Sequence, residues 1–105
     1  MENDEFPKLI FLDWQEGDEI VINQKGWFCN NVVELANGNR YQVCFFDKGN
    51  LIGVLNHSEE EGKPFFIENA LIVLSEITIE SMNAAIIEAE KLKFFENLKP
   101  INSQK

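Results

Sequence analysis

The sequence contains few of the residues with which enzymes usually do chemistry. It has one histidine, His57, and two cysteines, Cys29 and Cys44, without a C-x-x-C or H-x-x-x-H pair. Zinc sites usually take paired ligands from one turn, so these three separated residues do not predict one. The glycines form neither G-x-G-x-x-G nor a P-loop. We therefore predict no catalytic residue, no metal, no cofactor and a protein that is not an enzyme.

Long apolar runs are also missing. No stretch reaches the roughly 18 apolar residues that a membrane-spanning helix needs. The first five residues are Met-Glu-Asn-Asp-Glu, whereas a signal peptide begins basic and continues apolar. These features predict a cytoplasmic protein, and in that compartment we expect Cys29 and Cys44 to be free thiols.

Basic residues are scarce, and the resulting negative charge is concentrated in two segments. Nine Lys and Arg oppose eighteen Asp and Glu, which gives a formal charge of −9. Residues 1–19 contain seven carboxylates and one lysine, hence −6, and residues 58–68 contain four carboxylates and one lysine, hence −3. Nucleic acid and anionic membranes would be repelled by this charge, so we expect neither as a partner.

The densest acidic segment also contains a tryptophan, which makes it the candidate partner-binding site. An aromatic side chain among charges is a frequent anchor in protein interfaces, although a tryptophan that packs at the rim of a sheet is an alternative. The leading hypothesis is a non-enzymatic interaction module that docks on a basic protein, in the manner of small bacterial immunity proteins and other nuclease inhibitors. That analogy concerns charge and size only. The candidate residues are Asp13, Trp14, Glu16, Asp18 and Glu19.

Three alternatives remain. Nine phenylalanines could line a small-ligand pocket between the sheet and a C-terminal helix. A homodimer could form through an exposed strand edge, which only Lys8 and Lys25 would guard. The negative charge could also serve solubility alone.

The length of 105 residues predicts one domain, with residues 1–7 and 101–105 as frayed tails. Alternating or continuous apolar residues predict strands at 8–14, 20–23, 27–35, 39–47 and 65–67, with a central strand covered on both faces at 70–77. Two helices are predicted, at 48–58 with Asp47 as its cap and at 79–97 with Thr78 as its cap. The expected fold class is α+β: a mainly antiparallel sheet with the C-terminal helix and a shorter middle helix packed on one face.

The clearest local signal is a hairpin around Ala36-Asn37-Gly38. The apolar residues Trp27, Cys29 and Val33 on the first strand, and Tyr41 on the second, are all odd-numbered, so facing residues should sum to an even number. A three-residue loop satisfies this condition, pairs Val33 with Tyr41 and places Gly38 where positive φ is needed. The same register puts Cys29 and Cys44 on opposite faces, which predicts that they do not bond to each other.

Overall fold

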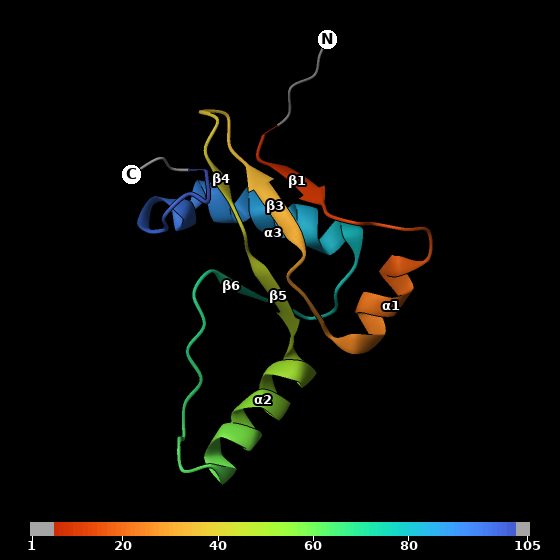
Figure 1. Ribbon diagram of the computed structural model, residues 1–105, viewed down its shortest axis with the longest axis vertical. Helices are drawn as coiled ribbons and strands as arrows, with labels where there is room; N and C mark the ends of the chain where they lie inside the picture. The colour runs from red at the N-terminus through yellow and green to blue at the C-terminus, as the bar shows by residue number, and fades with distance from the viewer. Residues whose placement is uncertain (1–5, 103–105) are drawn as a thin grey trace.

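The computed structural model describes residues 6–102, which form three α-helices, one 3₁₀-helix and six strands (Figure 1). The predicted frayed ends at 1–5 and 103–105 lie outside the described residues. In chain order the elements are β1 (Lys8–Phe11), α1 (Asp18–Lys25), β2 (Trp27–Phe28), β3 (Asn31–Glu34), β4 (Arg40–Tyr41), β5 (Cys44–Asp47), α2 (Lys48–Glu60), β6 (Leu71–Leu74), α3 (Ile79–Lys91) and the 3₁₀-helix η1 (Phe94–Asn97).

The strands form two small sheets rather than one. The first has the order β1-β3-β4 and is antiparallel throughout. The second has the order β2-β5-β6, in which β2 pairs antiparallel and β6 parallel with β5. The parallel pair needs a crossover, and α2 supplies it. The predicted α+β class with mostly antiparallel strands is therefore confirmed, with two sheets in place of a single one.

The hairpin between β3 and β4 has the predicted register. Val33 faces Tyr41, and the Leu35 N–H donates to the Asn39 carbonyl at 2.9 Å across the Ala36-Asn37-Gly38 loop. Gly38 has φ of 92°, a conformation that a side chain would strain. This short loop and the alternation of apolar residues therefore fix the pairing, as the sequence indicated.

The predicted strand 27–35 is broken, and the break changes which residues point inward. β2 ends at Phe28, which is buried, whereas Trp27 is 42% exposed, the reverse of the prediction. The odd-numbered pattern resumes only in β3. Because Cys29 lies in the break, it is not held to strand alternation and forms a disulfide with Cys44, with 4.2 Å between their Cα atoms. The predictions of free thiols and of opposite faces were both wrong.

Residues 20–23, predicted as a strand, belong to helix α1. Glycines with left-handed φ bound this helix, Gly17 before it and Gly26 after it. Asp18 and Glu19 occupy its first turn, where carboxylates are favourable to the helix dipole. Gly26 is further required because a Cβ there would lie 2.9 Å from the Asp47 carboxylate. These local signals outweigh the β-branched run Ile20-Val21-Ile22.

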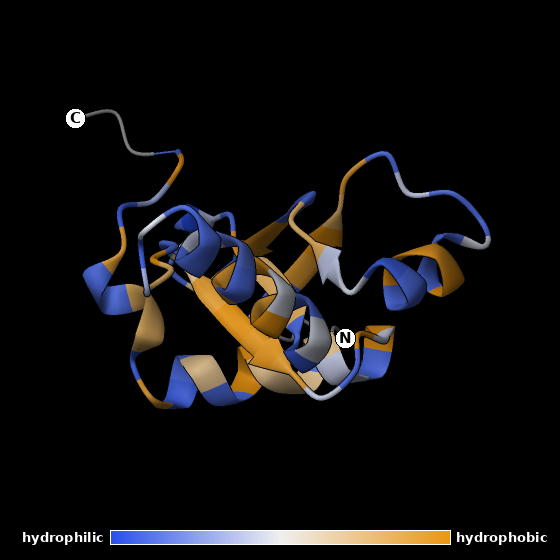
Figure 2. Ribbon diagram, turned by 90° about the horizontal axis from the view of Figure 1, so that it is seen from below, coloured by the Kyte–Doolittle hydropathy of each residue, from blue (hydrophilic) through white to orange (hydrophobic). Residues whose placement is uncertain are grey.

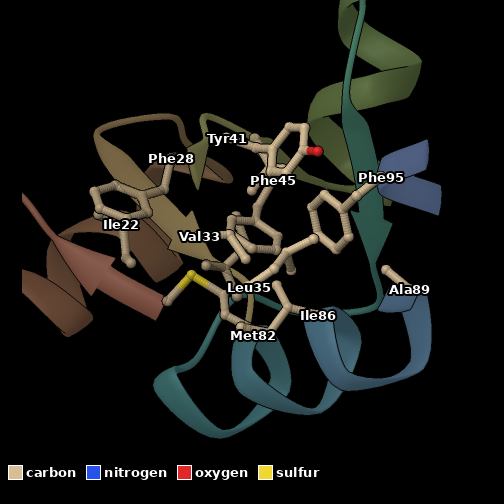
Figure 3. Close-up of a cluster of buried hydrophobic side chains, with 12 residues drawn as sticks. Ile22, Phe28, Val33, Leu35, Tyr41, Phe45, Met82, Ile86, Ala89 and Phe95 are labelled. Carbon is tan, nitrogen blue, oxygen red and sulfur yellow. The ribbon is translucent and has the colours of Figure 1, made fainter. Parts of the chain in front are cut away.

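The core lies between the two sheets and helix α3. Figure 3 shows Phe45 and Tyr41 from the strands facing Ile86 and Met82 from α3, with Phe95 of η1 beside them. In the hydropathy view of Figure 2 the strands are mostly orange, whereas the helices alternate between blue and orange. In the part of the chain that the structure describes, twelve apolar residues are buried and form one cluster. One polar residue joins them: Asn31, whose side chain donates to the Val43 carbonyl at 3.0 Å.

The predicted central strand at 70–77 is a shorter strand, β6, at the edge of the second sheet. It pairs only with β5 in the described chain, and Val73 is 45% exposed. An apolar run cannot distinguish a doubly covered strand from one with a free edge. The short strand predicted at 65–67 is irregular in the structure.

Both predicted helices form with their predicted caps. The Asn50 N–H donates to Asp47 Oδ1 at 2.8 Å at the start of α2, and the Ser81 N–H donates to Thr78 Oγ1 at 2.9 Å at the start of α3. The middle helix is not the shorter one, since each has 13 residues. The helical prediction to residue 97 is interrupted at Lys93, whose left-handed φ of 62° separates α3 from η1.

The C-terminal end of the described chain is held in place rather than frayed. The Ile101 N–H donates to the Arg40 carbonyl at 2.7 Å, and the Arg40 N–H donates to Asn102 Oδ1 at 3.0 Å. Residues 101 and 102 therefore extend the contacts of β4, whereas the rest of the predicted tail lies outside the described residues. Within residues 6–102, none of the helices combines the length and apolar character that crossing a membrane requires.

Candidate partner-binding site beside helix α1

Two side chains of α1 fix this helix against the start of α3. The Ile79 N–H donates to Glu19 Oε2 at 2.9 Å, and Asn23 Nδ2 donates to the Ile77 carbonyl at 2.9 Å. Ile79 is the first residue of α3, so the Glu19 carboxylate meets the positive end of that helix. Glu19, predicted to bind a partner, thus has an internal role that positions the rest of the acidic segment.

Trp14 is held by aromatic packing. Its ring stacks on Phe11 with 4.4 Å between centroids, and Phe28 meets it edge-on at 5.7 Å. The indole is half-buried, so it closes the rim of the core more than it projects into solvent. This is the alternative that the sequence left open for Trp14.

A hollow of about 240 Å³ lies between the segment before α1 and the start of β2. We call it the α1 hollow. Asp13, Trp14 and Asp18 line it, so the structure brings three of the five candidate residues together. The Asp18 carboxylate also accepts the Gln15 N–H at 2.9 Å, which orders the turn before the helix.

The other two candidate residues lie outside the α1 hollow. Glu16 is exposed in the turn before Gly17. Glu19 lines a separate hollow with Glu76 and Thr78. Of the predicted set, then, Asp13 and Asp18 are the acids at the α1 hollow, and Glu16 is an exposed acid near it in sequence.

Trp27 and Lys25 also line the α1 hollow, although neither belongs to the predicted set of site residues. Lys25 Nζ lies 4.0 Å from the centroid of the Trp27 ring, within the range of a cation–π contact. Trp27 is exposed and lines the hollow together with Asp13 and Asp18. Strand parity wrongly placed it in the core, because Phe28 next to it is equally apolar. The adjacent Gly26, which ends α1 with a left-handed φ, was the signal that Trp27 follows directly on a turn.

The chemistry of the α1 hollow suits binding. It offers two carboxylates and an aromatic face, both of which attract cationic groups. Cys29 also lines it, but its sulfur is bonded to Cys44, so neither thiol is present as a nucleophile in this state. His57 lies on α2, where its Nε2 is 3.2 Å from Glu61 Oε2. Across residues 6–102, no three His, Cys, Asp or Glu side chains converge as a metal site would require.

A second hollow bears on the small-ligand alternative. It measures about 350 Å³ and lies between β6, α3 and η1, where Ile72, Leu74, Leu92 and Phe94 line it. The centre of the sheet–helix interface is filled by buried side chains such as Phe45 and Ile86. The hollow is therefore at the open edge of the interface, and one phenylalanine lines it rather than the several expected.

Comparisons with family models, with curated proteins and with solved structures found no match to this chain. No residue role can therefore be carried over from a relative. The function has to be inferred from the surfaces of this molecule, of which the α1 hollow combines charge, an exposed aromatic ring and a concave shape.

Proposed function

We propose that the protein is a non-enzymatic interaction module that binds a basic protein at the α1 hollow. The observation that carries this proposal is the grouping of Asp13 and Asp18 with the exposed Trp27 ring around one concavity. Interfaces draw most of their affinity from a few such aromatic anchors.

A cytoplasmic location remains part of the proposal. The Cys29–Cys44 disulfide is the feature that argues against this location, because disulfides are rare in the cytoplasm.

Electrostatics supports a basic partner. The chain carries a formal charge of −9, and two of its carboxylates line the hollow while Glu16 is exposed nearby. Complementary charge raises association rates by steering the encounter, and salt screens the effect. A basic partner would therefore associate fastest at low ionic strength.

The surroundings of the Trp27 ring support a partner that contributes an arginine to the contact. Lys25 already lies over the ring face at 4.0 Å, so the position accepts a cation. A guanidinium stacks on aromatic rings and forms two parallel hydrogen bonds with a carboxylate. An arginine of the partner that displaced Lys25 could contact Trp27 and Asp18 together.

A titration with an arginine-rich peptide, followed by amide NMR, tests the location of the site. We expect the amide shifts of residues 12–30 to move most, and the affinity to fall in the variant Asp13→Asn/Glu16→Gln. The matched control is Glu60→Gln/Glu68→Gln, which removes the same charge from two exposed carboxylates elsewhere. Trp27→Ala should weaken binding further, by about tenfold or more, if the ring is an anchor.

Two results would contradict the proposal. Shifts centred on residues 58–68 would move the site to the other acidic segment. Equal losses in the test variant and in its control would show that the peptide responds to net charge alone, which is the solubility alternative.

The apolar hollow beside β6 supports a second candidate, a small-ligand-binding domain. Its lining is almost entirely apolar, and Glu88 is the charged residue among those that line it. An amphiphilic fluorescent dye with an anionic head tests it. Enhanced fluorescence that Leu92→Ser abolishes would support the ligand-binding candidate, and unchanged fluorescence in that variant would dismiss it.

A further inference from the structure

Helix α2 presents an outward stripe in which one end is basic, the middle apolar and the other end acidic. The stripe consists of Lys48, Ile52, Leu55 and Glu59, all of them exposed. Their spacing of four, three and four residues places them on one side of a helix. Ile52 is 57% exposed and Leu55 is 38% exposed.

The fold of a single chain does not account for this stripe. Figure 1 shows α2 extending away from the two sheets and α3, with its far end distant from the core. Within residues 6–102, no residue of α2 is buried. Its half-buried residues, among them Leu51 and Val54, lie on the side next to the stripe, since Leu51 is one helical turn from Leu55. Two exposed branched apolar side chains thus stay in water beside the side of α2 that contacts β5 and β6.

The stripe is its own complement when two copies are placed antiparallel. In that arrangement Lys48 of each copy faces Glu59 of the other copy, and Ile52 faces Leu55. This follows because positions 48 and 59 are centred on the same point of the helix as positions 52 and 55, and the two-fold axis passes through that point. A two-fold axis makes each such contact occur twice. We propose that a second copy of this chain covers the stripe, so that the protein forms an antiparallel α2–α2 dimer.

The electrostatics of this arrangement is favourable at both ends of the contact. Each Lys48, at the start of its helix, meets the partner's acidic end, where Glu60 is also exposed next to Glu59. The helix dipoles are antiparallel, so their opposite ends also meet.

Sedimentation velocity across a range of concentrations tests the dimer. We expect the wild type to pass from monomer to dimer as concentration rises, and Ile52→Ser/Leu55→Ser to remain monomeric. The matched control is Ile87→Ser/Leu92→Ser, which changes one exposed isoleucine and one exposed leucine on and just after α3. That control should dimerise like the wild type, and circular dichroism of each variant checks that it is folded.

A charge exchange tests the antiparallel register. Lys48→Glu and Glu59→Lys should each raise the dissociation constant by about tenfold, because each change puts like charges opposite each other twice per dimer. The double variant Lys48→Glu/Glu59→Lys should return to within about threefold of the wild type, because the pairs are restored in reverse.

A wild type that stays monomeric at all accessible concentrations would overturn the inference. So would a dimer that the α2 variant leaves intact, or a double charge variant that is weaker than both single ones. The inference does not depend on the proposed function, since the α1 hollow is not part of the stripe. Asp13→Asn/Glu16→Gln should therefore leave dimerisation unchanged.

Discussion

Helices α2 and α3 are a matched pair that the fold uses in different ways. Each has 13 residues and begins at an extended residue whose side chain accepts a backbone N–H of the first turn. Helix α3 buries Met82, Ile86 and Ala89 in the core. In the part of the chain that the structure describes, α2 buries nothing comparable and extends from the end of β5 (Figure 1).

The difference shows that these two helices form for different reasons. Most helical stability in proteins comes from packing an apolar face, and α3 has such a face. Helix α2 depends on its cap, on its contacts with β5 and β6 and on any partner that covers it. It also contains two glycines, each of which costs about 1 kcal/mol relative to alanine. We therefore expect α2 to open locally while α3 opens only with the whole domain.

The largest expected difference comes from shortening one isoleucine on each helix. Ile86 is fully buried, so Ile86→Ala should lower the free energy of unfolding by about 4 kcal/mol, through lost burial and the cavity that remains. Ile52→Ala should lower it by less than about 0.5 kcal/mol, as for an exposed site. Urea unfolding at concentrations where the chain is monomeric measures both. Similar losses would mean that α2 is as much part of the core as α3.

The disulfide sharpens the comparison because it crosslinks the body of the fold and leaves α2 outside its loop. Cys29 and Cys44 are 15 positions apart, so replacing both by serine should lower stability by about 3 kcal/mol. Amides of α3 should then exchange with solvent faster, whereas those of α2, which open locally, should change little. Alkylation of the native protein should find no free thiol before reduction. Two reactive thiols in the native state would contradict the pairing.

The elements that the sequence predicted correctly are those with a local signal of specific geometry. The Asp47 and Thr78 caps, and the three-residue hairpin loop ending at Gly38, each involve a few neighbouring residues with one favourable arrangement. Such signals do not depend on what the rest of the chain does. The α+β class follows from the number and order of these elements.

The elements that the sequence could not predict depend on contacts between distant residues. Helix α1 is fixed through Glu19 and Asn23 to residues 77–79, more than fifty positions away. The break after Phe28 is coupled to the disulfide with Cys44. Similarly, β6 lies at the edge of its sheet because, in the described chain, it pairs with β5 alone. The pattern of apolar residues within one segment does not reveal these contacts between distant parts of the chain.

The negative charge of the candidate site could be predicted from the sequence, whereas its shape could not. The acidic segment was visible, but composition could not show that Glu19 bonds to the backbone of α3 or that Trp14 packs on Phe11. The more exposed aromatic, Trp27, joins the site because a turn brings the start of β2 beside the start of α1. A binding surface assembled from two segments is beyond what a single acidic run indicates.

Removing the two helix caps should have smaller and unequal effects. Thr78→Ala should lower global stability by about 1 kcal/mol, because α3 unfolds only with the domain. Asp47→Ala removes an equivalent bond, but we expect the cost to appear as faster amide exchange in α2, with a smaller change in the urea midpoint. Ser75→Ala, at an exposed residue between β6 and α3, serves as the control. Equal shifts of the midpoint would show that the two helices unfold together.

The smallest expected effect is a gain of stability confined to α2. Gly53→Ala should protect the amides of α2 by up to about 1 kcal/mol, because alanine favours the helix and the structure has space for its Cβ. Gly62→Ala is the contrasting change, since Gly62 has φ of 90° and a side chain there is strained. Weaker protection of α2 in Gly53→Ala than in the wild type would contradict this expectation.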